Sequence, residues 1–116
     1  MGNPVVHFEI GCRDKVRTKR FYAGLFGWSI EPKGPAEAIT TGSQAGINGH
    51  ITSLGHEPHQ YVTFYAEVDD VAAHLEKAER LGGRAMVPET EIPGEGRFAW
   101  LADPDGNVVG LWRSAT

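Results

Sequence analysis

The residues best suited to chemistry stand close together near the start of the chain, at His7 and Glu9. Apolar and polar residues alternate over Val5–Ile10, which is typical of a half-buried strand, and side chains two positions apart on a strand point to the same face. Imidazole is a common ligand for zinc, iron and nickel, and a carboxylate beside it can act as a general base. Such a pair more often forms the polar lining of a pocket, and the pattern leaves a metal-ligand role for His7 and a catalytic role for Glu9 open as the alternative.

The other histidines and the single cysteine give weaker signals. His50 lies in a glycine-rich segment that allows close approach of backbone or ligand. His56 and His59 stand three apart in a loop and are expected to be surface residues, and His74 is expected to be structural. Cys12 is expected to be a packed thiol rather than a nucleophile. Nucleotide-binding loops, the GxSxG motif, CxxC and HExxH do not occur in the sequence, so no other chemistry competes with these candidates.

Length, composition and charge exclude several classes of protein. A chain of 116 residues with 41% hydrophobic and 22% charged residues predicts one globular domain. Its net charge of −4 provides no basic surface for nucleic acid or an anionic membrane, so neither is an expected partner. No apolar run approaches the roughly 20 residues of a membrane-spanning helix, and the N-terminus lacks a signal peptide's apolar core. The single cysteine excludes an internal disulfide and favours a reducing cytoplasm.

The strand that carries the histidine and the carboxylate is followed by a predicted helix over residues 15–26. Asp14 is a good N-cap, and Gly27 is placed to end the helix. Apolar residues four apart predict an apolar stripe along it, formed by Phe21, Tyr22, Leu25 and Phe26. Further strands are expected at 28–31, where Pro32 stops the strand, and at 38–41 and 46–52.

The same pattern returns in the second half of the chain. A strand over 61–66 precedes a helix over 70–81, which Asp69 or Asp70 caps, and a short strand at 85–87 ends at Pro88. Phe98–Trp112 predicts a β-hairpin, because strand formers flank a turn of Asp, Pro, Asp, Gly and Asn. The neighbouring Gly-Glu-Gly-Arg run indicates a mobile loop.

The two halves align without a gap when residue n is set against residue n + 56. His7 then falls on Thr63, and Asp14 on Asp70. A capped helix with the same flanking strands, present twice, indicates an internal repeat. The sequence therefore predicts one α+β domain of two βαβββ modules, over 5–52 and 61–112, with a connector over 53–60.

Four motifs carry a resemblance to a known family: VVHFEI at the start, FYAGLFGW at the end of the first helix, EVDDV before the second, and ADPDGN in the last hairpin. With the paired modules they make the chain similar to the vicinal oxygen chelate superfamily, which includes glyoxalase I, bleomycin resistance proteins and extradiol dioxygenases. The resemblance implies that each module curls its sheet into a half-open cup and that two cups, often assembled across a dimer, enclose a cleft.

The resemblance also implies where a metal would bind. Metal-dependent members place one ligand on the first and one on the last strand of each module, and the corresponding positions here are His7, a position near Gly49 or His50, Thr63 and Gly110. His50 falls on Gly110 when Ile51 is set on Leu111. Thr63 is a poor ligand for such metals, and Gly110 has no side chain. The expectation is therefore no cofactor, or a weakly bound divalent metal at His7 and His50.

Aromatic residues around these positions suit a flat organic ligand. By alternation, Tyr61, Thr63 and Tyr65 share one strand face, and Gly110 and Trp112 share another. If these faces line the cleft, the small Gly110 leaves room for a ring. The expected ligand-binding residues are His7, His50, Tyr61, Thr63, Tyr65, Trp100, Gly110 and Trp112, and the alternative is that the tryptophans are core residues.

Three functions are compatible with this pattern. The losses at Thr63 and Gly110 favour a small-molecule-binding protein, similar to bleomycin resistance proteins, without a complete metal site. The alternatives are a metal-dependent lyase, isomerase or dioxygenase-type enzyme that uses His7 and His50 as ligands and Glu9 as base, and an interaction module with a vestigial cleft. A homodimer is expected, because a lone chain leaves part of each cup uncovered.

Overall fold

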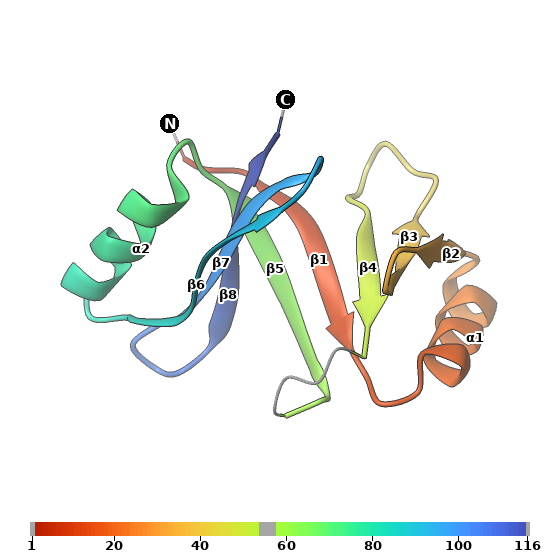
Figure 1. Cartoon of the computed structure of the whole chain (residues 1–116). Helices are drawn as coiled ribbons and strands as arrows, with labels where there is room; N and C mark the ends of the chain where they lie inside the picture. The colour runs from red at the N-terminus through yellow and green to blue at the C-terminus, as the bar shows by residue number, and fades with distance from the viewer. Residues whose placement is uncertain (1, 54–57, 116) are drawn as a thin grey trace. The chain divides into compact units, whose positions relative to one another are not determined.

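The computed structural model describes residues 2–53 and 58–115, and this part of the chain forms an α+β fold with two βαβββ repeats, as predicted (Figure 1). Backbone contacts divide it into two compact units, which we call the first unit (residues 7–63) and the second unit (residues 2–6 and 64–115). The elements in chain order are β1 (Val5–Gly11), α1 (Lys15–Phe26), β2 (Ser29–Lys33), β3 (Ala36–Thr40), β4 (Gly49–Thr52), β5 (Tyr61–Glu67), α2 (Val71–Arg80), β6 (Arg84–Ile92), β7 (Gly96–Ala102) and β8 (Val108–Ser114). Part of the predicted connector, residues 54–57 with His56, lies outside the described residues.

The first unit orders its strands β2-β3-β4-β1 and packs α1 against β2 and β4. β1 and β4 are parallel, whereas β2 with β3 and β3 with β4 are antiparallel. The core beneath α1 consists of Ile10, Cys12, Ile30, Ile39 and Ile51, with Phe8, Tyr22, Ala23 and Trp28 packed against it. Cys12 is thus a buried thiol, as predicted, and its Sγ donates to the Thr52 carbonyl at 3.6 Å.

The bounds of α1 match the prediction because both ends carry local signals. The Asp14 side chain accepts a hydrogen bond from the Arg17 amide at 3.1 Å, which satisfies one of the free donors of the first turn. At the other end, Gly27 has φ +70°, and its amide donates to the Ala23 carbonyl.

The apolar stripe predicted on α1 is only partly directed to the core. Tyr22 packs against the core and stacks on Trp28, but Phe21 and Leu25 remain 59% and 57% exposed. No residue of this helix is fully buried. Phe21 and Leu25 stay outside because Tyr22 and Ala23 form the side of the helix that packs against the core.

The second unit orders its strands β5-β8-β7-β6 and packs α2 against β6, β7 and β8. Its core consists of Val68, Val71, Leu75, Ala99 and Leu111. Asp70, rather than Asp69, is the N-cap of α2, with its side chain accepting from the Ala73 amide at 3.0 Å. Neither helix is long and apolar enough to cross a membrane.

The predicted hairpin is confirmed by β7 and β8, and the Asp-Pro-Asp-Gly-Asn turn between them is held by Asp103. Its carboxylate accepts from the amides of Asp105 and Asn107, each at 2.9 Å, and from the Asn107 side chain at 3.0 Å. These bonds hold the pKa of Asp103 below its usual value. Gly106 takes φ +93°, which this turn requires. The ADPDGN motif is therefore a structural feature of the turn.

Two predicted strand ends and one loop differ from the structure. Pro32 and Pro88 lie inside β2 and β6, which are the outermost strands of their units, and edge strands tolerate proline. The Gly-Glu-Gly-Arg run predicted as a mobile loop is a tight turn that leads into β7: the Glu95 amide donates to the Ile92 carbonyl, and the Glu95 carbonyl accepts from the Ala115 amide.

Strand register confirms the internal repeat at the positions that matter for the site. In the first unit Glu9 is paired with His50, and in the second unit Tyr65 is paired with Gly110. The predicted alignments set Tyr65 on Glu9 and Gly110 on His50, so the two strand pairings correspond. His50 and Gly110 are therefore equivalent positions of the two repeats.

Candidate functional site

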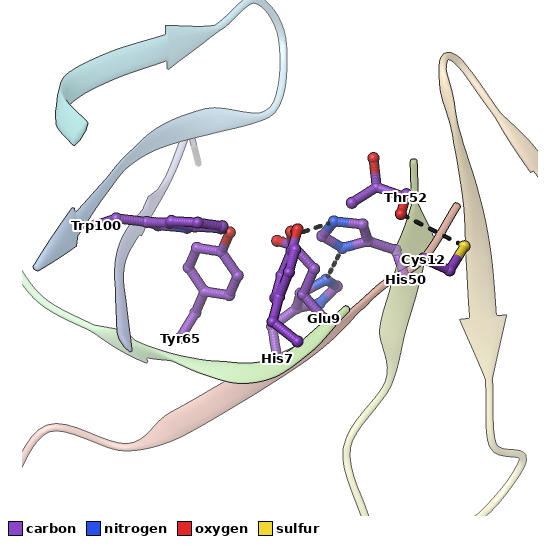
Figure 2. A network of polar contacts seen from close by, with 8 residues as sticks. His7, Glu9, Cys12, His50, Thr52, Tyr65 and Trp100 are labelled. Carbon is purple, nitrogen blue, oxygen red and sulfur yellow. Dashed lines mark hydrogen bonds and ion pairs between the residues drawn. The ribbon is translucent and has the colours of Figure 1, made fainter. Parts of the chain in front are cut away.

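His7 and His50 meet directly in the first unit. The parallel pairing of β1 with β4 sets Glu9 beside His50, and the His7 side chain reaches across to the same ring. His7 Nε2 lies 2.6 Å from His50 Nδ1, and the ring centroids are 4.9 Å apart (Figure 2). Two imidazoles predicted from separate segments are thus one hydrogen-bonded pair.

Glu9 extends this pair into a chain of four polar side chains, which we call the polar chain: His7, His50, Glu9 and Tyr61. Glu9 is only 4% exposed, and its Oε1 lies 3.2 Å from His50 Nε2. The Tyr61 hydroxyl at the start of β5 donates a hydrogen bond to the other carboxylate oxygen, Oε2. Figure 2 shows the His50 ring between His7 and Glu9. A buried carboxylate with donors at both oxygens is satisfied, which is what burial of a charge requires.

The direction of the polar chain follows from the protonation states of Glu9 and His50. For an ionised Glu9, which can only accept, and a neutral His50, His50 donates from Nε2 and accepts at Nδ1. His7 must then donate from Nε2, because the two nitrogens are 2.6 Å apart and one of them has to carry the proton. In this assignment His7 donates to His50, His50 donates to Glu9, and Tyr61 donates to the other oxygen of Glu9. Glu9 is therefore the final acceptor.

Burial keeps the two ends of the polar chain uncharged at neutral pH. Desolvation lowers the pKa of His7 to about 4, and the neighbouring His50 contributes to this lowering, while Glu9 partly opposes it. Burial, together with the hydrogen bond to Glu9, raises the pKa of Tyr61 above its ordinary value. A neutral imidazole and a neutral phenol therefore flank the Glu9–His50 pair.

Small residues make room for these rings. A methyl group added to Gly11 would overlap the Tyr61 ring, and one added to Gly49 would overlap the Phe8 carbonyl. Both glycines lie in strands that carry the site, β1 and β4. Their lack of a side chain lets Tyr61 lie against the backbone and lets β4 approach β1.

The donor set of the first unit does not fit a bound transition metal as it stands. Two nitrogens bound to one tetrahedral ion at 2.0–2.1 Å would be about 3.3 Å apart, so the His7–His50 hydrogen bond would have to break first. Thr63, the third predicted position, is buried and offers a weaker donor than the histidine or carboxylate that such ions prefer. Within residues 2–53 and 58–115, no three His, Cys, Asp or Glu side chains are arranged to hold a metal ion.

The aromatic candidates of the second unit are mutually bonded. Trp100 Nε1 donates to the Tyr65 hydroxyl at 2.8 Å, and both residues are buried (Figure 2). Gly110 is the strand partner of both, and a methyl group on it would overlap the Tyr65 ring. Trp112 is half-buried and lies against Gly96. The room that Gly110 leaves is therefore filled by Tyr65.

Sequence reasoning selected His7, Glu9, His50 and Tyr61 individually but missed the hydrogen bonds that join them. The alternation of β1 predicts that His7 and Glu9 share a face, and this is confirmed by the contacts that both make with His50. The contact with Tyr61 had no signal in the single sequence, since Tyr61 and Glu9 lie on segments far apart along the chain. His74, predicted to be structural, bonds the Asp70 carbonyl in the first turn of α2 at 3.1 Å.

Comparison with known proteins agrees with this fold. The model of the Glyoxalase/Bleomycin resistance protein/Dioxygenase superfamily matches residues 5–111, and the chain belongs to this family. The chain is 31% identical to the putative glyoxylase CFP32 of Mycobacterium tuberculosis, over 91% of the chain and 44% of the relative. It is 29% identical to the anthracycline biosynthesis protein DnrV of Streptomyces peucetius, over 91% of the chain and 45% of the relative. The chain thus spans less than half the length of these curated relatives.

Solved structures show the same fold at low identity. A methylmalonyl-CoA epimerase from Mycobacterium tuberculosis superposes with a TM-score of 0.69 at 14% identity, covering 97% of this chain and 88% of the epimerase. A superfamily member from Vibrio splendidus superposes with a TM-score of 0.66 at 15% identity, covering 97% and 99% of the two chains. At this identity the likeness is one of fold alone.

Proposed function

We propose that this chain is a cytoplasmic protein that binds a small organic molecule at the polar chain of the first unit, without a complete metal site. The proposal rests on the His7–His50 hydrogen bond of 2.6 Å and on the contacts that continue it through Glu9 to Tyr61. This hydrogen bond occupies the nitrogen atoms that would bind a metal. The polar chain then presents oriented polar groups beside the half-buried Tyr61 ring. The buried thiol of Cys12, in a chain with a single cysteine, supports the reducing compartment.

The chemistry of the polar chain favours a flat molecule that carries a hydroxyl group. A neutral His7 and a neutral Tyr61 present hydrogen-bonding groups at no cost in buried charge, and the Tyr61 ring supplies an aromatic face. The relatives include a protein of anthracycline biosynthesis, and on this ground an aromatic ligand is part of the proposal.

A matched pair of probes tests this proposal. Titration of the protein with 2-naphthol and with naphthalene, followed by tryptophan fluorescence and calorimetry, should show tighter binding of 2-naphthol, because only its hydroxyl can bond the polar chain. His7→Phe should remove most of the difference, which for one hydrogen bond is about fivefold in affinity. Tyr22→Phe, at a tyrosine outside the polar chain, is the control and should leave both affinities unchanged. Equal affinity for the two probes, or no binding of either, would contradict the proposal.

The metal-dependent alternative, a lyase, isomerase or dioxygenase-type enzyme, is favoured by one observation. Histidines that bind metals usually donate their second ring nitrogen to a carboxylate, and His50 Nε2 faces Glu9 in this manner. In that function His7 and His50 would be ligands and the nearly buried Glu9 would serve as base. One tightly held transition metal per chain in the purified protein, lost in His7→Ala, would establish it over the metal-free proposal.

A further inference from the structure

A row of charged side chains crosses the sheet of the second unit, on the face that α2 packs against. Strand pairing sets Glu91 of β6 opposite Arg97 of β7, and Arg97 opposite Arg113 of β8, so the three side chains point to one face. By alternation along β7 this is the face of Ala99, which packs against α2, and not the face of Trp100. The row therefore lies apart from Trp100 and shares no residue with the polar chain.

The row lines a cavity of about 470 Å³ at the N-terminal end of α2, which we call the α2 cavity. Glu89 of β6 and Asp70, the N-cap of α2, also line this cavity, as does Ile92, which is 39% exposed. Binding sites for small molecules commonly have volumes of about 300–1,000 Å³. The α2 cavity therefore has room for a small organic molecule and offers it charged groups together with an apolar contact.

The two arginines of the α2 cavity keep most of their hydrogen-bond donors unused. Arg97 Nη1 lies 3.8 Å from Glu89 Oε2, and Nη2 lies 4.0 Å from Glu91 Oε1, which is too long for a hydrogen bond. Within the described part of the chain the Arg97 guanidinium makes no hydrogen bond, and that of Arg113 donates only to the Asp69 carbonyl, at 2.6 Å. A guanidinium has five N–H donors, so both arginines can bind a further acceptor.

The charges of the α2 cavity select a ligand that carries both signs. Like charges directly opposite on neighbouring strands destabilise a sheet, and a carboxylate bound by Arg97 and Arg113 would compensate both. The carboxylates of Glu89 and Glu91 accept no hydrogen bond from any residue that the structure describes, so they can accept from an ammonium group. These four side chains have no net charge, which disfavours a phosphate dianion or a bare cation. The remaining carboxylate, that of Asp70, already caps α2.

We infer that the α2 cavity binds a free α-amino acid. The carboxylate of the amino acid lies between Arg97 and Arg113. Its ammonium group, on the next carbon, faces Glu89 and Glu91, and an apolar side chain contacts the exposed Ile92. This is a second ligand site, in a different unit and of different chemistry from the site proposed at the polar chain.

Three matched probes test the inference. Leucine carries both charges, 4-methylpentanoate lacks the ammonium group, and leucinol lacks the carboxylate. In calorimetric titrations at neutral pH, leucine should bind at least about tenfold more tightly than either analogue, because each analogue loses one set of charge-assisted hydrogen bonds. In amide NMR spectra, the signals of Gly94 and Gly96, which line the α2 cavity, should shift on addition of leucine.

Substitutions in the α2 cavity assign each charge of the probe to its side chains. Arg97→Gln should bind leucine no better than the wild type binds leucinol, and Glu89→Gln with Glu91→Gln no better than the wild type binds 4-methylpentanoate. Circular dichroism confirms that the variants are folded. The control is Arg80→Gln, which removes an exposed arginine from the last turn of α2 and should leave leucine binding unchanged.

Several results would overturn the inference. They are absence of leucine binding at millimolar concentration, and binding of either analogue or of inorganic phosphate as tightly as leucine. Leucine binding that Arg97→Gln does not weaken, or that Arg80→Gln weakens equally, also overturns it. His7→Phe should bind leucine as the wild type does, so this test is independent of the 2-naphthol titration.

Discussion

At the scale of single residues, the site depends on which atoms carry protons. Glu9 is the acceptor at the centre, and His50 and Tyr61 donate to its two oxygens. Residue types alone left open a metal ligand at His7 and a base at Glu9, beside the polar lining of a pocket. The structure shows instead that His7 is engaged with His50, and this contact could not be predicted because it depends on the register of β1 with β4, which are separated in the sequence by a helix and two strands.

The pH dependence of stability should report the environment of His7. Its pKa is about 4 when folded and 6.5 in the unfolded chain, so the unfolded state binds more protons between these values. Stability is therefore fully present above pH 6.5 and falls as the pH drops towards 4. This residue alone contributes a slope of at most about 1.4 kcal/mol per pH unit.

His7→Gln isolates this contribution, because glutamine can still donate a hydrogen bond but does not titrate. Urea unfolding between pH 4 and pH 7 should give a shallower loss of stability for the variant than for the wild type. His59→Gln, at a histidine outside the polar chain, serves as control for the other imidazoles. Parallel curves for His7→Gln and the wild type would show that His7 has no depressed pKa.

At the scale of elements, local signals predicted where the helices begin and end better than which of their side chains are buried. Asp14 and Gly27 mark the ends of α1, and both act through hydrogen bonds or a backbone angle that a few neighbouring residues determine. The exposure of Phe21 and Leu25 was not predicted, since periodicity shows that a stripe exists but not what covers it. The sequence predicts strand ends at Pro32 and Pro88, which lie inside β2 and β6, because it does not reveal which strands are outermost.

Replacement by alanine should change the stability of the protein in opposite directions at Gly24, inside α1, and at Gly27, at its C-terminal end. Gly27 has φ +70°, so Gly27→Ala should destabilise the protein by about 1 kcal/mol. Gly24 lies inside the helix with no atom within 4 Å of an added methyl group, so Gly24→Ala should stabilise it by about 0.5–1 kcal/mol. Chemical denaturation measures both. Equal effects of the two changes would contradict a left-handed end of α1 at Gly27.

At the scale of the whole molecule, the gapless alignment of residue n with residue n + 56 predicted the fold. The equivalence of His50 with Gly110 came from a second alignment, which sets Ile51 on Leu111, and the strand pairings agree with it. Together the alignments predicted that two of four metal positions had lost their donors, but not that the remaining two bond each other. This chain covers less than half the length of its curated relatives, so its function has to be measured on this chain itself.

Metal binding is the measurement that separates the two functions for the whole protein. The folded state depends on two apolar cores, around Ile39 with Ile51 and around Val71 with Ala99, and neither core includes His7 or His50. The purified protein should therefore carry substoichiometric metal and lose it to mild chelation without loss of helix signal or a change in melting temperature.

A ligand present at 100 times its dissociation constant raises stability by about 2.7 kcal/mol, so addition of zinc or nickel to the apoprotein is a sensitive converse test. A stabilisation of that size at micromolar metal, absent in His50→Ala, would show that the His7–His50 hydrogen bond opens readily to admit an ion, and would favour the enzyme over the binding protein.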